Sequence, residues 1–166
     1  MQKDAVPVVT RRGKYNPGLW ATITVIVLIA GTADILLAFL QHYLLRGTSP
    51  LTILKFIASG LLGKAAFTGG NTMAGWGLLI HFLIVFAWTY FFFLAYPKLA
   101  SLVPNRWLRA ALIAVFIWIV MNLVVLPLSR TPATPLQLEG TLLSMAILFL
   151  AVGIPISFFL HRHYHR

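Results

Sequence analysis

The sequence contains no cysteine and only three acidic residues among its 166 positions. The absence of cysteine excludes disulfides, thiolate metal sites and cysteine nucleophiles. Charged residues of both signs make up 10% of the chain, whereas soluble domains carry about 25%. Hydrophobic residues account for 60%, so the shortage of charge excludes an ordinary soluble domain and indicates a protein that resides in a membrane.

The scarcity of acids leaves a formal net charge of +10 at neutral pH. Nucleic acid is the usual partner of so basic a chain. Here, however, the basic residues lie at the edges of apolar runs and do not follow one soluble face. We therefore predict no binding of nucleic acid, and we expect these residues to contact anionic lipid headgroups and to set the membrane topology.

Four apolar runs have the length of a membrane span, and they cover residues 19–40, 76–95, 107–128 and 141–160. At about 1.5 Å of rise per residue, each run crosses a hydrocarbon core of roughly 30 Å. Lipid offers the backbone no hydrogen bonds, so the runs must be helical. We expect Pro97 to end the second run. The sequence predicts an all-α integral membrane protein, a four-transmembrane-helix bundle.

The stretch 50–75 between the first two runs lacks the pattern of a simple loop. Residues 51–63 are apolar, but they number only 13 and include Lys55, and a glycine-rich stretch follows them. Such a segment is too short and too charged to span the bilayer, so we predict a short interfacial or re-entrant helix. We favour the interfacial helix, because irregular backbone at membrane depth needs protein or water around it.

The distribution of basic residues predicts that both termini lie in the cytoplasm. With that orientation nine basic residues face the cytoplasm and four face outward, the outer four being Arg46, Lys55, Lys64 and Arg130. Residues 1–18 then form a polar cytoplasmic tail, residues 19–160 a single membrane domain, and residues 161–166 a basic tail rich in histidine.

Each run contributes one polar residue at a similar depth below the outer membrane boundary. Counting about 1.5 Å per residue, the depths are roughly 9 Å for Asp34, 7.5 Å for His81, 9 Å for Asn122 and 4.5 Å for Ser144. Ionisable residues within spans are costly and usually functional, and Asp34 is the only acid in any run. We predict a polar cluster that opens outward, in which Asp34 and His81 form a pair that binds and releases a proton.

Further candidates surround this cluster. His42 shares a helical face with Gly31 and Asp34 just beyond the first run, and Gly31 would let another helix approach closely. Residues expected at the outer mouth are Lys55, Lys64, Asn71, Arg130 and Glu139. Arg109, near the inner end of its run, is expected to snorkel to the interface. An open alternative is that the cluster only joins helices by hydrogen bonds, worth about 0.6 kcal/mol each.

Histidines at the end of the chain are weak metal candidates. His161 and His165 have i, i+4 spacing, and alternating histidines can bind metal. We favour a cationic anchor at the lipid headgroups for this tail. Haem held between helices would need facing histidines, and only His42 and His81 lie near the membrane region. We predict no cofactor.

The second half of the chain carries several short motifs. His81 opens an aromatic-rich span, Tyr96-Pro97-Lys98 follows that span, and Val125-Leu126-Pro127-Leu128 with Pro132 follows the third. Over residues 76–162 the chain resembles the YagU-like family of bacterial inner-membrane proteins. The resemblance implies a multi-span architecture in a bacterial inner membrane, and it supplies no catalytic residue.

These observations favour a small proton- or ion-linked transporter or channel. We expect a homo-oligomer, because four short spans enclose little volume alone. A non-catalytic membrane scaffold or assembly partner is the alternative. An enzyme or a haem- or metal-binding protein is favoured less, since no motif of soluble catalysis is present.

Overall fold

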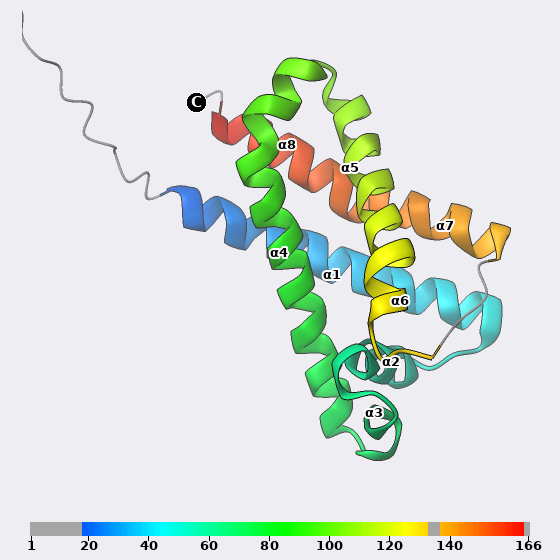
Figure 1. The fold of residues 1–166 in the computed structure, drawn as a ribbon. Helices are drawn as coiled ribbons and strands as arrows, with labels where there is room; N and C mark the ends of the chain where they lie inside the picture. Colours follow the sequence, from blue (N-terminus) through cyan, green and yellow to red (C-terminus); the bar gives the residue numbers. More distant parts are fainter. Residues whose placement is uncertain (1–17, 133–136, 165–166) are drawn as a thin grey trace, which may run out of the picture.

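The computed structural model describes residues 18–132 and 137–164, and this part of the chain is helical without any strand (Figure 1). In chain order the elements are α1 (Gly18–Arg46), α2 (Pro50–Leu62), α3 (Ala65–Thr68), α4 (Thr72–Leu102), α5 (Arg106–Val120), η1 (Met121–Val125), α6 (Leu126–Leu128), α7 (Leu138–Leu148), η2 (Phe149–Gly153) and α8 (Ile154–Tyr164).

Within the described residues, four helical segments are long and apolar enough to cross a membrane. They are Gly18–Arg46, Thr72–Leu102, Arg106–Leu128 and Leu138–Tyr164, and the shorter apolar helix α2 lies between the first two. The predicted fold class is therefore confirmed. Many large apolar side chains on these segments are exposed, as expected of a surface that faces lipid tails.

The second span does not end at Pro97, because α4 continues to Leu102. Proline has no N–H and cannot donate to the carbonyl four residues earlier, which here belongs to Phe93. The hydroxyl of Tyr164 donates to that carbonyl oxygen at 3.0 Å. A partner on α8 thus satisfies the acceptor that Pro97 leaves free, and the helix runs on.

Two of the spans contain a π-helical turn, and both turns stand in the same relation to a proline. The turn η1 ends two residues before Pro127, and η2 ends two residues before Pro155. A proline ring clashes with the carbonyl four residues earlier. Wider i→i+5 bonding relieves that crowding, so each proline accounts for the π-helical turn before it.

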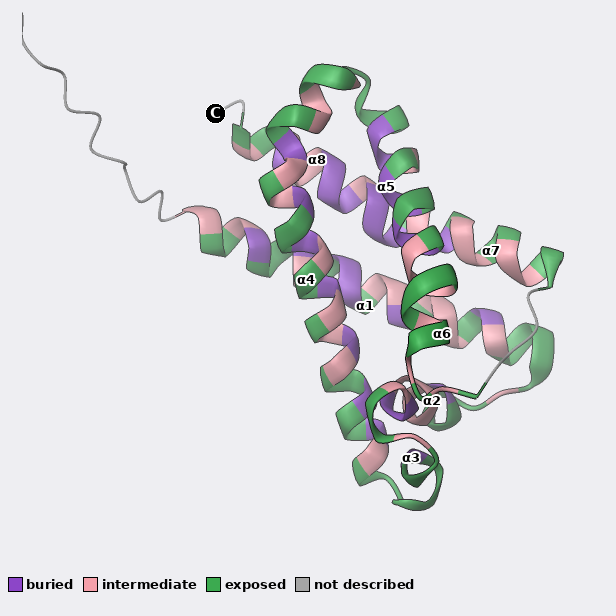
Figure 2. Ribbon diagram, viewed as in Figure 1, coloured by how far each residue is buried: buried purple, intermediate pink, exposed green. Residues whose placement is uncertain are grey.

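The helices form two crossing sets. In Figure 1, α1 lies alongside α7 and α8, while α4 and the α5–α6 segment cross them. Buried residues gather where the two sets face one another (Figure 2), and the core includes Ile26, Val85, Ile113 and Ile156. A Cβ at Gly153 would collide with the backbone carbonyl of Ala110, so glycine lets α5 approach η2 closely.

The short helix α2 lies across one end of the bundle. Figure 1 shows it nearly end-on, below α6 and beside the lower end of α4. Ser49 caps its N-terminus by accepting from the N–H of Thr52. A Cβ at Gly77 of α4 would collide with the Leu54 carbonyl, so α2 and α4 meet backbone to backbone. With 13 residues, α2 is shorter than a membrane span.

Candidate functional site

His81 on α4 is buried, with 7% of its surface exposed, and it faces α1. Its Nε2 donates a hydrogen bond of 2.9 Å to the carbonyl oxygen of Gly31. A Cβ at position 31 would lie 2.6 Å from the ring of Phe82, so any larger residue there would require the Phe82 ring beside His81 to shift. Because a carbonyl oxygen can only accept, the bond places a proton on Nε2.

Asp34 lies three residues beyond Gly31 on α1 and is half-buried. Its carboxylate interacts electrostatically with His81, but it receives no hydrogen bond from a described residue. The two residues predicted to pair are therefore neighbours, although the imidazole bonds to the backbone of α1 and not to the carboxylate. Together they place two protonatable groups between α1 and α4.

Asn122 and Ser144 meet at a third residue, Trp118. The side-chain amide of Asn122 donates to the Trp118 carbonyl oxygen at 3.0 Å, and the Trp118 indole donates to the Ser144 hydroxyl at 3.1 Å. Only the bond to Ser144 joins the third span to the fourth, because Asn122 and Trp118 both belong to the third. Across the described residues no hydrogen bond connects them to Asp34 or His81. In the described part of the chain, the four predicted residues therefore do not form one hydrogen-bonded cluster.

Two other predicted residues, His42 and Glu139, line one cavity of about 300 Å³ between the end of α1 and the start of α7. Its remaining lining residues are Gln41, Leu45, Arg46, Gln137 and Gly140. The Nδ1 of His42 bonds only to the Ala38 carbonyl of its own helix, at 2.9 Å. The Arg46 guanidinium donates to the Gln137 side chain at 3.0 Å.

The other residues expected at the outer mouth lie outside this cavity. Lys55 is half-buried in α2, whereas Lys64 and Asn71 are exposed on either side of α3. Arg130 is exposed, and its backbone N–H donates to the Gly60 carbonyl at 3.1 Å. These residues follow α2 and its neighbours, and they do not surround the Asp34 and His81 site.

Arg109 does not extend into solvent, as a snorkelling side chain would. Its side chain is only 2% exposed, because the turn between α4 and α5 folds over it. One terminal nitrogen, Nη1, donates to the carbonyl oxygens of Val103 and Pro104 at 3.0 and 3.3 Å. The guanidinium also lies 5.2 Å from the centre of the Tyr96 ring, close enough for a cation–π interaction.

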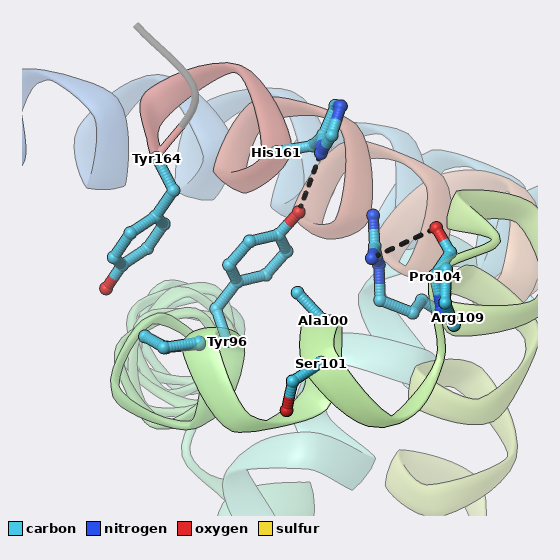
Figure 3. A pocket seen from close by; sticks show the side chains of 8 residues that line it. Tyr96, Ala100, Ser101, Pro104, Arg109, His161 and Tyr164 are labelled. Atoms are coloured by element: carbon cyan, nitrogen blue, oxygen red, sulfur yellow. Dashed lines mark hydrogen bonds between the residues drawn. The ribbon is translucent and has the colours of Figure 1, made fainter.

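Arg109 lines a second cavity, of about 440 Å³, at the end of the bundle where α4, α5 and α8 meet (Figure 3). The other lining residues are Tyr96, Pro97, Ala100, Ser101, Pro104, His161 and Tyr164. Sequence reasoning identified none of these as a site around Arg109. The one available signal was an arginine inside an apolar run that contains no acid.

His161, a weak metal candidate, contacts the Tyr96 hydroxyl through Nδ1 at 3.1 Å, while His165 lies outside the described residues. In the described part of the chain, no three histidine or acidic side chains gather as metal ligands would. Comparison of the chain with protein-family models, curated proteins and solved structures found no match. The likeness to the YagU-like family accordingly stays a prediction.

Proposed function

We propose that this chain is a small multi-pass membrane protein in which Asp34 and His81 form a protonatable site for proton- or ion-linked transport. The observation that carries the proposal is the position of the buried His81 imidazole, bonded through Nε2 to Gly31, beside the Asp34 carboxylate. Ionisable groups within membrane spans are rare and generally mark ion or proton pathways.

Proton exchange at this site needs no new bond between the helices. His81 keeps its Nε2–H on the Gly31 carbonyl, accepts a proton at Nδ1, and becomes an imidazolium whose charge the Asp34 carboxylate offsets. Release of that proton restores the neutral ring. The α1–α4 contact through Gly31 is therefore compatible with both states.

The π-helical turns η1 and η2 support a conformational step. Such turns occur mainly as short interruptions at functional sites, and Asn122 lies within η1. We propose that the third and fourth spans bend at these turns when the site gains or loses its proton. We further propose a bacterial inner membrane, both termini in the cytoplasm, anionic lipid contacts and a homo-oligomeric assembly.

Proton flux into liposomes tests the proposal with Asp34→Asn, which removes the carboxylate and keeps its shape. Glu139→Gln is the matched control, because it makes the same chemical change at an exposed position of α7. We expect flux from the wild type and from Glu139→Gln, and none from Asp34→Asn. Equal flux from all three proteins, or none from any of them, contradicts the proposal.

The bond between His81 and Gly31 also favours a second function, that of a non-catalytic scaffold. In this alternative Asp34 and His81 only hold α1 against α4, as interhelical polar contacts commonly do. Asp34→Asn would then change the stability or oligomeric state in detergent, and no protein would carry flux.

A further inference from the structure

The guanidinium of Arg109 has hydrogen-bond donors that the described residues do not use. Its Nε and Nη2 are buried and have no partner, while Nη1 donates to two backbone carbonyls. Nε carries one N–H and Nη2 carries two. Three charged donors therefore remain unpaired on a side chain that is 98% buried, since 2% is exposed.

Among the described residues, no acidic side chain offsets the positive charge of Arg109. The acids in the described residues are Asp34 and Glu139, and neither lines the cavity beside Arg109. The cation–π contact with Tyr96 offsets only part of the cost of burial. A buried charge without a partner is strongly unfavourable, so an anion bound beside Arg109 would stabilise the folded protein.

The cavity beside Arg109 is built to receive such an anion. Its volume of about 440 Å³ falls within the roughly 300–1,000 Å³ of small-ligand pockets. Figure 3 shows the Tyr96 hydroxyl and His161 on the α8 side of the cavity and Ser101 on the α4 side. The Ser101 hydroxyl donates to the Lys98 carbonyl at 2.8 Å and is not available to an anion. The Tyr96 hydroxyl lies 3.1 Å from Nδ1 of His161, and when Nδ1–H donates to it, the hydroxyl can donate its own hydrogen into the cavity.

The position of the cavity along the spans indicates which kind of anion it binds. Arg109 lies in the first turn of α5, and Tyr96 and His161 lie close to the ends of the second and fourth spans. That level corresponds to the membrane interface, where lipid phosphates are concentrated. Arginine suits phosphate because its planar fork can donate two parallel hydrogen bonds to two oxygens.

We propose that Arg109, with Tyr96 and His161, binds a phosphate group, either on an anionic lipid headgroup or on a soluble phosphate. The site is separate from the Asp34 and His81 pair. Fifteen residues separate His81 from Tyr96 on α4, which is roughly 22 Å along the helix axis. The test below reads binding alone and does not depend on transport.

The test uses the full chain, purified in detergent and reconstituted in nanodiscs. Inorganic phosphate is titrated in detergent at constant ionic strength while the thermal unfolding midpoint is recorded, because a ligand that binds only the folded state raises it. In parallel, retention of phosphatidic acid from mixed phosphatidylcholine nanodiscs is measured by native mass spectrometry. A response to phosphate alone identifies a soluble ligand, and retention of phosphatidic acid alone identifies a lipid.

The decisive variant is Arg109→Gln, with Arg106→Gln as its matched control. Arg106 carries the same charge three residues away, but it is exposed and its guanidinium lies over the Phe158 ring at 4.8 Å. We expect Arg109→Gln to weaken binding about tenfold to a hundredfold, the size of a lost charge-assisted hydrogen bond. Arg106→Gln should bind as the wild type does.

Three results overturn the proposal. They are the absence of any response to either probe, an unchanged affinity in Arg109→Gln, and an equal loss in Arg106→Gln, which would indicate unspecific attraction to charge. If Arg109→Gln aggregates, Tyr96→Phe decides the question, because it keeps the ring and removes one donor. Reduced affinity in Tyr96→Phe supports the site, and unchanged affinity rejects it.

Discussion

The hydroxyl of Tyr164 donates a hydrogen bond to the carbonyl of Phe93, the acceptor that Pro97 leaves without its helical partner. The bond ties the end of α8 to the last turns of α4. It also explains how α4 continues through a proline at the level of the membrane interface.

Tyr164→Phe should therefore lower the free energy of unfolding in detergent by about 0.5–1.5 kcal/mol, the net contribution of one hydrogen bond. In a Pro97→Ala background the alanine N–H can satisfy the Phe93 carbonyl, so the same substitution should cost much less. A double-mutant cycle measured by thermal or denaturant unfolding gives the coupling. Equal costs in both backgrounds would show that the two residues act independently.

A methyl group at Gly77 should separate α2 from α4. Its Cβ would strike the Leu54 backbone carbonyl, which cannot move aside as a flexible side chain can, so Gly77→Ala should destabilise by about 1–3 kcal/mol. Gly75→Ala is the control, because nothing lies within 4 Å of its added Cβ. It should be neutral or stabilising by up to about 1 kcal/mol, since alanine favours helix. Similar midpoints for both variants would argue against close packing of α2.

The contact between Trp118 and Ser144 should be measurable as an interhelical hydrogen bond. Ser144→Ala removes the acceptor of the indole N–H, and we expect a loss of about 0.6 kcal/mol, the average for such bonds in membrane proteins. In a Trp118→Phe background the loss should disappear, because the donor is already absent. An undiminished cost there would assign the effect to packing of the serine.

Replacement of His81 separates its structural role from its chemical one. His81→Leu fills the site with an apolar side chain and removes the bond to Gly31. The free energy of unfolding should therefore fall by about 0.6–1.7 kcal/mol. His42→Leu is the control, because His42 bonds only within its own helix. Proton flux that survives in a folded His81→Leu protein would count against a proton site at this histidine.

Much of the architecture follows from the sequence because membrane spans are dictated by length and composition. The four runs and the apolar segment after Pro50 became the four spanning helices and α2. The proximity of Asp34 to His81 was also predictable, since both have a similar predicted depth on consecutive spans. The hydrogen bond that His81 makes was not predictable, because the imidazole bonds to the Gly31 carbonyl. The depth of a residue does not show which backbone carbonyls its side chain can reach.

Four residues show what a linear sequence omits. Counting residues gave the depth of Asn122 and Ser144 but not the direction of either side chain around its helix, and Trp118 stands between them. Pro97 and Arg109 depend on partners outside their own spans. The Tyr164 hydroxyl bonds to the carbonyl that Pro97 leaves without a partner. The turn after Leu102 covers the Arg109 side chain. Such effects arise only when distant segments pack.

The π-helical turns before Pro127 and Pro155 have a consequence for the choice of positions to label or cross-link. Each turn inserts one residue beyond the regular α-helical repeat, so the side chains after it are rotated by about 100° from where a helical wheel would draw them. A helical wheel of the third span is therefore valid only up to Met121, and one of the fourth span only up to Phe149. Beyond Val125 and Gly153 it has to be started afresh, and positions that look lipid-facing on one continuous wheel then point toward neighbouring helices.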